Sequence, residues 1–118
     1  MLDRIASPAL RVFAIWEPIL QTDTEQTARR ATVLLDDPRV DHYWTATTDV
    51  GTAFQPAIGL ATEPAWDVYL LYDGRTEWVD RPPKPRVFMH QLAGRLPDAS
   101  LLDAEKLAGH IRDLLQGQ

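Results

Sequence analysis

Residue types that carry chemistry are sparse in this chain, and the missing types exclude whole classes of reaction. The 118 residues contain no cysteine, which excludes thiolate metal sites, thiol nucleophiles and dithiol redox cycles. Serine occurs only at Ser7 and Ser100, outside any G-x-S-x-G motif, and no phosphate-binding glycine loop is present. The three histidines, His42, His90 and His110, lack the spacing of metal ligands. We therefore expect no metal and no other cofactor.

The composition is that of one globular domain spanning residues 1–118. Hydrophobic residues make up 45% of the chain, which is enough to build a core at this length. Lys and Arg number 12 and Asp and Glu number 17, so the net charge is -5, which argues against nucleic-acid binding. No apolar run is long enough to cross a membrane, and the opening MLDRIASPAL lacks a signal-peptide pattern. We expect a cytoplasmic protein without membrane contacts.

The elements that must position any site follow from hydrophobic periodicity and turn residues. The run LRVFAIW is unbroken after Arg11, which is typical of a strand buried on both faces, whereas residues 39–45 alternate like a strand nearer an edge. Asp73-Gly74 is a hairpin turn signal between two further strands. Strands are therefore predicted over 10–16, 39–45, 66–72 and 75–79, and helices over 22–37, 49–58 and 103–115.

This order, β-α-β-α-β-β-α, resembles the core of the thioredoxin-like family. The resemblance rests on DVGTAF as a short helix, Pro64 just before the strand WDVYLLY, the hairpin YDGRTEW and the last helix LLDAEKLAGHIRDLL. It implies an α/β fold with a four-stranded mixed sheet, helices on both faces and an inserted segment over residues 81–100. The first two strands would be parallel and the last two antiparallel. The implied strand order is 39–45, 10–16, 66–72, 75–79.

The redox motif of that family has no counterpart here. The first strand runs into WEPIL, which starts at Trp16 and holds no thiol, so the chain resembles a redox-inactive member. The resemblance places Glu17 at the mouth of a helix, where the helix dipole is expected to lower its pKa. It also implies a cis bond between Glu63 and Pro64, which would expose backbone for pairing with an extended peptide. Trp16 would be an exposed binding anchor.

The first hypothesis is a binding domain for a protein or peptide partner, or for a second copy of itself. Binding would use backbone pairing in a groove between the Trp16–Pro18 loop and the Pro64 edge, with the inserted segment beside it. The candidate binding residues are Trp16, Glu17, Pro18, Glu63, Pro64, Phe88, His90 and Gln91.

Two alternatives stay open. In the first, the chain is an assembly or stability subunit whose groove is filled by apolar residues of the inserted segment, namely Val87, Phe88, Met89 and Leu92. In the second, the chain is a small enzyme. Glu17 and His90 would then form an acid–base pair, or the site would support glutathione-type transfer, which some thioredoxin-fold enzymes perform without a thiol of their own.

Overall fold

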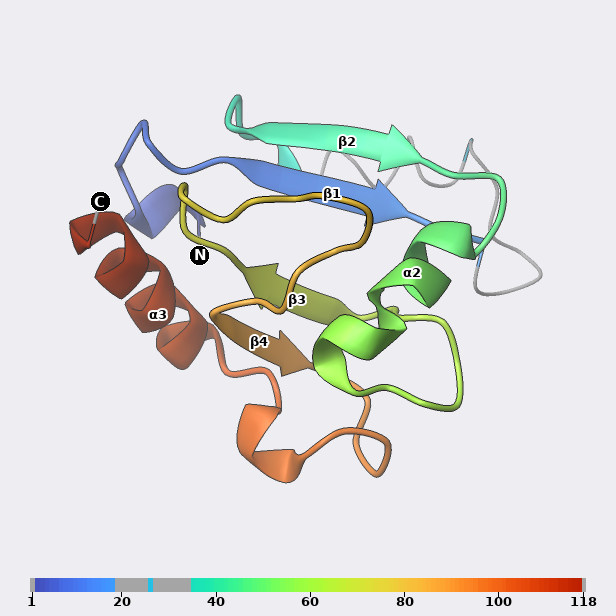
Figure 1. Cartoon of the computed structure of the whole chain (residues 1–118). Helices are drawn as coiled ribbons and strands as arrows, with labels where there is room; N and C mark the ends of the chain where they lie inside the picture. Colours follow the sequence, from blue (N-terminus) through green and yellow to red (C-terminus); the bar gives the residue numbers. More distant parts are fainter. Residues whose placement is uncertain (1, 19–25, 27–34, 118) are drawn as a thin grey trace.

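The computed structural model describes residues 2–18, 26 and 35–117. Along the chain the elements are η1 (Leu2–Arg4), β1 (Val12–Trp16), β2 (Val40–Trp44), α2 (Asp49–Ile58), β3 (Val68–Leu71), β4 (Val87–His90), η3 (Asp98–Ser100) and α3 (Ala104–Gln116). Two strand pairs lie beside one another, with α3 at one end and α2 at the other (Figure 1). The predicted helix over 22–37 falls mostly outside the described residues.

β1 and β2 form a parallel pair, which confirms the parallel pairing predicted for the first two strands. The register runs from Val12 opposite Val40 to Trp16 opposite Trp44. Burial alternates along both strands, so every second side chain is exposed. The expectation that the first strand is buried on both faces is therefore wrong, because nothing in the described part of the chain covers one of them.

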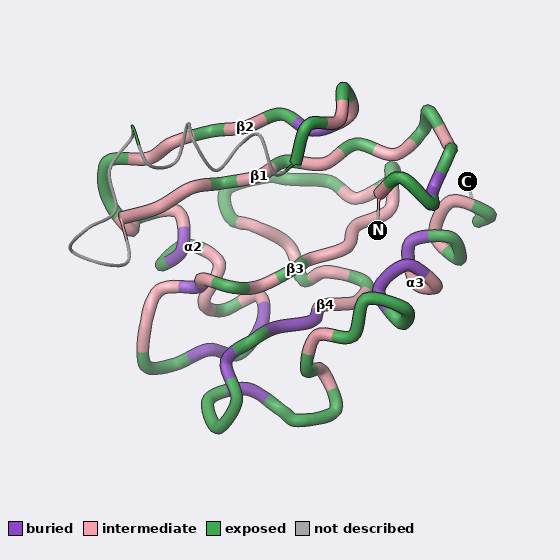
Figure 2. The backbone as a smooth tube through the Cα atoms, turned by 180° about the vertical axis from the view of Figure 1, so that it is seen from behind, coloured by how far each residue is buried: buried purple, intermediate pink, exposed green. Residues whose placement is uncertain are grey.

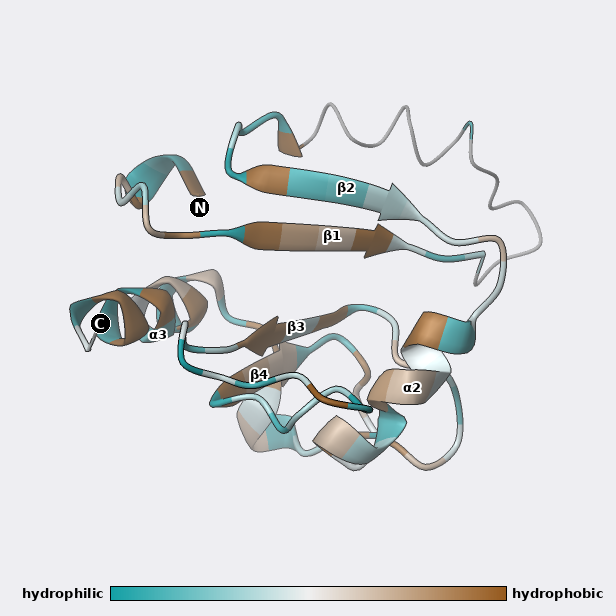
Figure 3. Ribbon diagram, turned by 45° about the horizontal axis from the view of Figure 1, so that its top comes forward, coloured by the Kyte–Doolittle hydropathy of each residue, from teal (hydrophilic) through white to brown (hydrophobic). Residues whose placement is uncertain are grey.

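β3 pairs antiparallel with β4, from Val68 opposite His90 to Leu71 opposite Val87. The described strands form two separate sheets of two strands each, and no ladder joins β1 to β3. Figure 3 shows the two pairs as distinct units. The predicted four-stranded mixed sheet, with strand order 39–45, 10–16, 66–72, 75–79 and helices on both faces, is therefore wrong.

The segment 75–79 is not a strand, and its side chains explain why. The turn itself forms, since Asp73 Oδ1 accepts the Arg75 N–H at 2.9 Å. Beyond it, the ring of Trp78 lies 4.7 Å from that of Tyr72, and the neighbouring Val79 is 81% exposed. A strand here would bury little apolar surface. The apolar β4, in the segment read as an insertion, pairs with β3 instead because its side chains enter the core.

Two apolar clusters cover the two faces of the β3–β4 pair. The first joins the residue after η1 to β4 and α3 through Ile5, Met89, Leu107, Ala108 and Ile111. The second joins α2 to the loops around the sheet through Ile58, Leu60, Ala65, Leu92 and Leu96. Figure 2 shows buried residues gathered on β4 and α3, while β1 and β2 are mostly half-buried or exposed. The core therefore belongs to the β3–β4 half of the molecule.

The two described α-helices confirm their predicted positions, because their ends are set locally. α2 ends at Gly59, whose left-handed backbone (φ 71°) carries an N–H that donates to the Gln55 carbonyl. α3 begins after Asp103, whose side chain accepts the Lys106 N–H at 3.1 Å. Both ends depend on residues within one turn, which is why sequence alone locates them.

The N-terminal segment is tied to the start of β2 by Arg39. Its guanidinium donates to the carbonyls of Leu2 at 2.8 Å and Ser7 at 3.1 Å, and to that of Ile5. The same guanidinium pairs with Asp37 at 2.8 Å. These bonds hold Ile5 where it enters the first apolar cluster.

No peptide bond among the described residues is cis, so the Glu63–Pro64 bond is trans and the cis expectation is wrong. The trans form of an X–Pro bond is favoured by about 0.5–1 kcal/mol unless tertiary contacts override it. Here the Glu63 carbonyl accepts a hydrogen bond from Gln55 Nε2 at 2.7 Å in the trans arrangement.

Candidate functional site

Trp16 closes β1 and is fixed against β2. Its indole N–H donates to His42 Nδ1 at 3.0 Å, and the two rings stack with centroids 6.0 Å apart. Because Nδ1 accepts, His42 carries its proton on Nε2, which lies 3.3 Å from the Leu35 carbonyl. The indole is half-buried. The Trp16 side chain is therefore held in place at the end of β1. It is not the freely exposed anchor that the sequence predicted.

Glu17 reaches from the end of β1 to the first turn of α2. Its Oε1 accepts the Gly51 N–H at 2.6 Å, in a helix whose N-cap residue Thr48 makes no side-chain capping bond. Burial raises the pKa of Glu17 above 4.5, and the hydrogen bond from Gly51 opposes that rise only in part. The expected lowering of this pKa is therefore wrong, because desolvation outweighs the helix end. No cation of the described residues pairs with the carboxylate.

Gly51 joins the loop after β1 to the segment around Pro64. The Ala65 N–H donates to the Gly51 carbonyl at 2.9 Å. A Cβ at Gly51 would lie 2.6 Å from the Ala65 carbonyl oxygen and 2.8 Å from Glu17 Oε2. Gly51 thus contacts both Glu17 and the residue that follows Pro64, and the sequence prediction did not name it. The sequence signal for Gly51 was a glycine inside the first turn of an apolar helix. The predicted groove between the Trp16–Pro18 loop and the Pro64 edge stays a prediction.

Glu63 and Pro64 have structural roles next to Ala65. The Glu63 carboxylate pairs with Arg95 Nε at 3.2 Å. Its buried Oε1 has no partner in hydrogen-bond geometry, so the ion pair is its compensation. Pro18 and Pro64 are both half-buried.

His90 is fully buried and committed to the backbone. Its Nε2 lies 2.8 Å from the Pro97 carbonyl, and its Nδ1 accepts the Leu92 N–H at 3.0 Å. No hydrogen bond or ion pair joins it to Glu17 in the described chain. The structure does not assemble the predicted Glu17–His90 acid–base pair, and His90 instead holds the loop between β4 and η3.

Phe88 and Gln91 belong to the β3–β4 unit. Phe88 is half-buried and packs against the second apolar cluster. Gln91 is exposed, and its N–H donates to the Asp67 carbonyl at 3.0 Å. The basic residues nearby pair locally, Arg86 with Asp73 and Arg95 with Glu63.

The backbone edge of β1 that faces away from β2 is the feature the sequence did not reveal. The Val12 N–H donates to the Arg39 carbonyl at 3.0 Å, and the Trp16 carbonyl accepts the Thr45 N–H at 2.9 Å. In a parallel ladder the alternate residues, Phe13 and Ile15, then point their N–H and C=O groups to the opposite edge. Those groups have no backbone partner among residues 2–18 and 35–117.

The side chains of Phe13 and Ile15 on this edge are apolar and exposed to solvent. Phe13 is 61% exposed and Ile15 42% exposed, and both lie on the same face of the strand. Tyr43 of β2 continues that face, with its ring 6.4 Å from that of Phe13. The carboxyl end of β1 lies beside α2 (Figure 1), so the edge leads toward Glu17 and Gly51.

The described part of the chain holds no group of three or more His, Cys, Asp or Glu that could bind a metal ion. None of its helices is long and apolar enough to cross a membrane. Comparisons with protein-family models, curated proteins and solved structures found no match to this chain. The resemblance to the thioredoxin-like family thus stays a sequence prediction, and any function rests on the geometry of the chain itself.

Proposed function

We propose that this chain is a binding domain that takes an extended peptide of a partner protein by strand addition at the free edge of β1. The observation that carries the proposal is the unpartnered backbone of Phe13 and Ile15 in the described residues. Native proteins usually blunt such an edge with charge, proline or a covering element. Here the two residues are apolar and exposed, so an added strand would gain ladder hydrogen bonds and apolar contacts together.

The end of the edge favours a basic residue in the peptide. Glu17 is a partly buried carboxylate whose pKa is raised by burial, and no described cation neutralises it. A Lys or Arg of the peptide would pair with the Glu17 carboxylate and offset the free-energy cost of its desolvation. The net charge of -5 adds long-range attraction for such a peptide.

Binding is favoured over the predicted acid–base reaction because the histidine rings near the strands are already engaged. Both ring nitrogens of His90 and both of His42 interact with groups of the chain. A general base needs a free acceptor within reach of its substrate.

A peptide titration followed by NMR of the full chain tests the proposal. The probe is an alternating Val-Lys peptide of the length of β1, and we expect it to shift the amides of Phe13 and Ile15. The control is the same peptide N-methylated on every second residue, which removes the donors of one edge but keeps sequence and charge. Equal binding of both peptides would show that charge alone attracts them and would overturn strand addition.

A further inference from the structure

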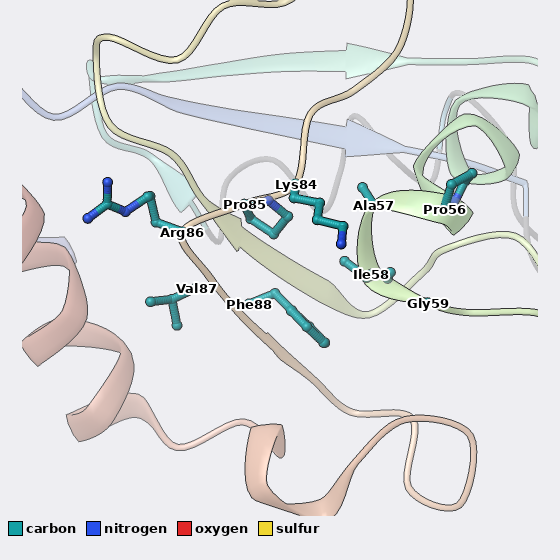
Figure 4. A pocket seen from close by; sticks show the side chains of 9 residues that line it. All are labelled: Pro56, Ala57, Ile58, Gly59, Lys84, Pro85, Arg86, Val87 and Phe88. Atoms are coloured by element: carbon teal, nitrogen blue, oxygen red, sulfur yellow. The ribbon is translucent and has the colours of Figure 1, made fainter.

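A second feature lies at the carbonyl end of α2, whereas Glu17 contacts the first turn of that helix. A hollow of about 440 Å³ separates the carbonyl end of α2 from the segment that leads into β4 (Figure 4). Its floor is formed by the apolar Ile58 and Phe88, whereas the Val87 side chain points to the other side of β4 (Figure 4), and the lining includes no Asp or Glu. The volume falls within the range of about 300–1,000 Å³ that small-molecule sites occupy.

The walls of the hollow are held in place by the fold. The Tyr72 hydroxyl donates to the Pro83 carbonyl at 2.7 Å, and the Arg86 N–H donates to the Leu71 carbonyl at 2.8 Å. Between these two bonds Pro85 restricts the backbone further. A ligand would therefore meet a preformed surface and would not have to order the segment first.

Two cations line the hollow, and only one of them lacks a partner. Arg86 pairs with Asp73 at 3.2 Å, and Figure 4 shows its side chain directed away from α2. The exposed Lys84 extends toward Ile58 in the same view, and no hydrogen bond or ion pair joins it to another described residue. The Lys84 ammonium thus lies beside apolar side chains, in a protein whose net charge is -5.

We infer that this hollow binds a small apolar carboxylate, such as an aryl-substituted short-chain acid. The carboxylate would pair with the Lys84 ammonium, and the apolar body would lie over Phe88 and Ile58. This site is separate from the β1 edge and does not depend on peptide binding there. The competing reading is that Lys84 only compensates the negative end of the α2 dipole, which a cation in this position also does.

An NMR titration of the full chain with phenylacetate tests the inference, with phenylacetamide as a neutral probe of the same shape. We expect phenylacetate to shift the amides of Ile58, Gly59 and Phe88, and the amide analogue to bind about two- to fivefold more weakly, as an exposed charge pair allows. Equal affinity for the two probes, or no shifts at these positions, would overturn the inference.

Two lysine variants separate a binding role from a structural one. Lys84→Met keeps the apolar stem and removes the charge, so phenylacetate should lose about two- to fivefold in affinity while phenylacetamide does not. Lys106→Met, at the other lysine of the chain, should change neither affinity. If Lys84→Met lowers thermal stability but leaves the phenylacetate affinity unchanged, Lys84 serves the helix end alone and the site is refuted.

Discussion

At the scale of single residues, Gly51 is a position where the structure leaves no room for a side chain. Any Cβ there meets the Ala65 carbonyl oxygen at 2.6 Å, and that oxygen is backbone, which cannot rotate away. We predict that Gly51→Ala lowers the free energy of unfolding by about 1–3 kcal/mol, the usual cost of overpacking. Urea denaturation measures it.

The matched control is Gly109→Ala in α3. A Cβ at Gly109 meets nothing within 4 Å, and the residue sits inside a helix, so alanine should stabilise the protein by about 0.4–1 kcal/mol. Loss of stability in both variants would mean that any Gly→Ala change in these helices is destabilising. The loss at Gly51 would then not come from its contacts with Glu17 and Ala65.

The titration of Glu17 makes the stability of the protein depend on pH, and the sign of this dependence follows from its pKa. Burial raises its pKa above 4.5 in the folded chain, so its contribution to stability is fully present below that value and is lost as pH rises through the folded pKa. Glu17→Gln removes the titration while its amide oxygen can still accept the Gly51 N–H. We predict that the stability of the variant relative to the parent increases between about pH 4 and about pH 7.

Asp37 provides a control with the opposite sign. The hydrogen bond from the Arg39 side chain lowers its pKa from 3.8 to about 2, so its contribution is present above 3.8 and is lost as pH falls through about 2. Asp37→Asn should therefore be destabilising at neutral pH, and the difference from the parent should shrink toward pH 2. Thermal melts across this range test both variants, and parallel pH profiles would contradict the assignment.

At the scale of elements, His90 shows a chemical residue type in a structural role. It is 0% exposed, and a leucine in its place would leave the buried Leu92 N–H without its partner, whereas the Pro97 carbonyl would keep the Ser100 N–H. We predict that His90→Leu costs about 1–3 kcal/mol for the N–H left unpaired. His110→Leu on α3, where no bond is lost, should stay within about 0.5 kcal/mol. Equal costs in the two variants would contradict this role for His90.

The elements that sequence could predict are those with local determinants. Gly59 and Asp103 mark helix ends within one turn of the bonds they make, so α2 and α3 were found. The partner of β3 was missed because Asp73-Gly74 is a strong local turn signal, whereas the true partner β4 lies beyond a proline-rich connection. That choice depends on apolar burial between distant segments, which a single sequence does not display.

The features of the candidate site also differ in whether local sequence determines them. The groove between the Trp16–Pro18 loop and the Pro64 segment was implied by the family resemblance alone and stays a prediction. The pKa direction of Glu17 was not, because it depends on how far the carboxylate is desolvated. The free edge of β1 was also hidden, since LRVFAIW has the same pattern whether a strand has one neighbour or two.

At the scale of the whole molecule, stability is uneven in a way that suits the proposed function. Both apolar clusters belong to the β3–β4 half, and neither includes a residue of β1 or β2. We predict that the bonded amides of β1 and β2 exchange with deuterium faster than those of β3, β4 and α3. Uniform protection across both sheets would show a single cooperative core.

Self-association is the alternative use of the same edge at this scale. Two copies could pair their β1 edges, which would place Phe13 and Ile15 in a dimer interface. Sedimentation at increasing concentration distinguishes the two cases, because our proposal predicts a monomer in the absence of peptide. A concentration-dependent dimer that Ile15→Lys dissociates would replace the partner peptide with a second copy.

The measurement that tests the central proposal most directly is hydrogen exchange at the amides of Phe13 and Ile15, with and without the alternating Val-Lys peptide. We predict fast exchange at both amides in the free chain, and slowing at saturating peptide that the N-methylated peptide does not produce. Strong protection of these two amides in the free chain, or no change on adding the peptide, would contradict strand addition at β1.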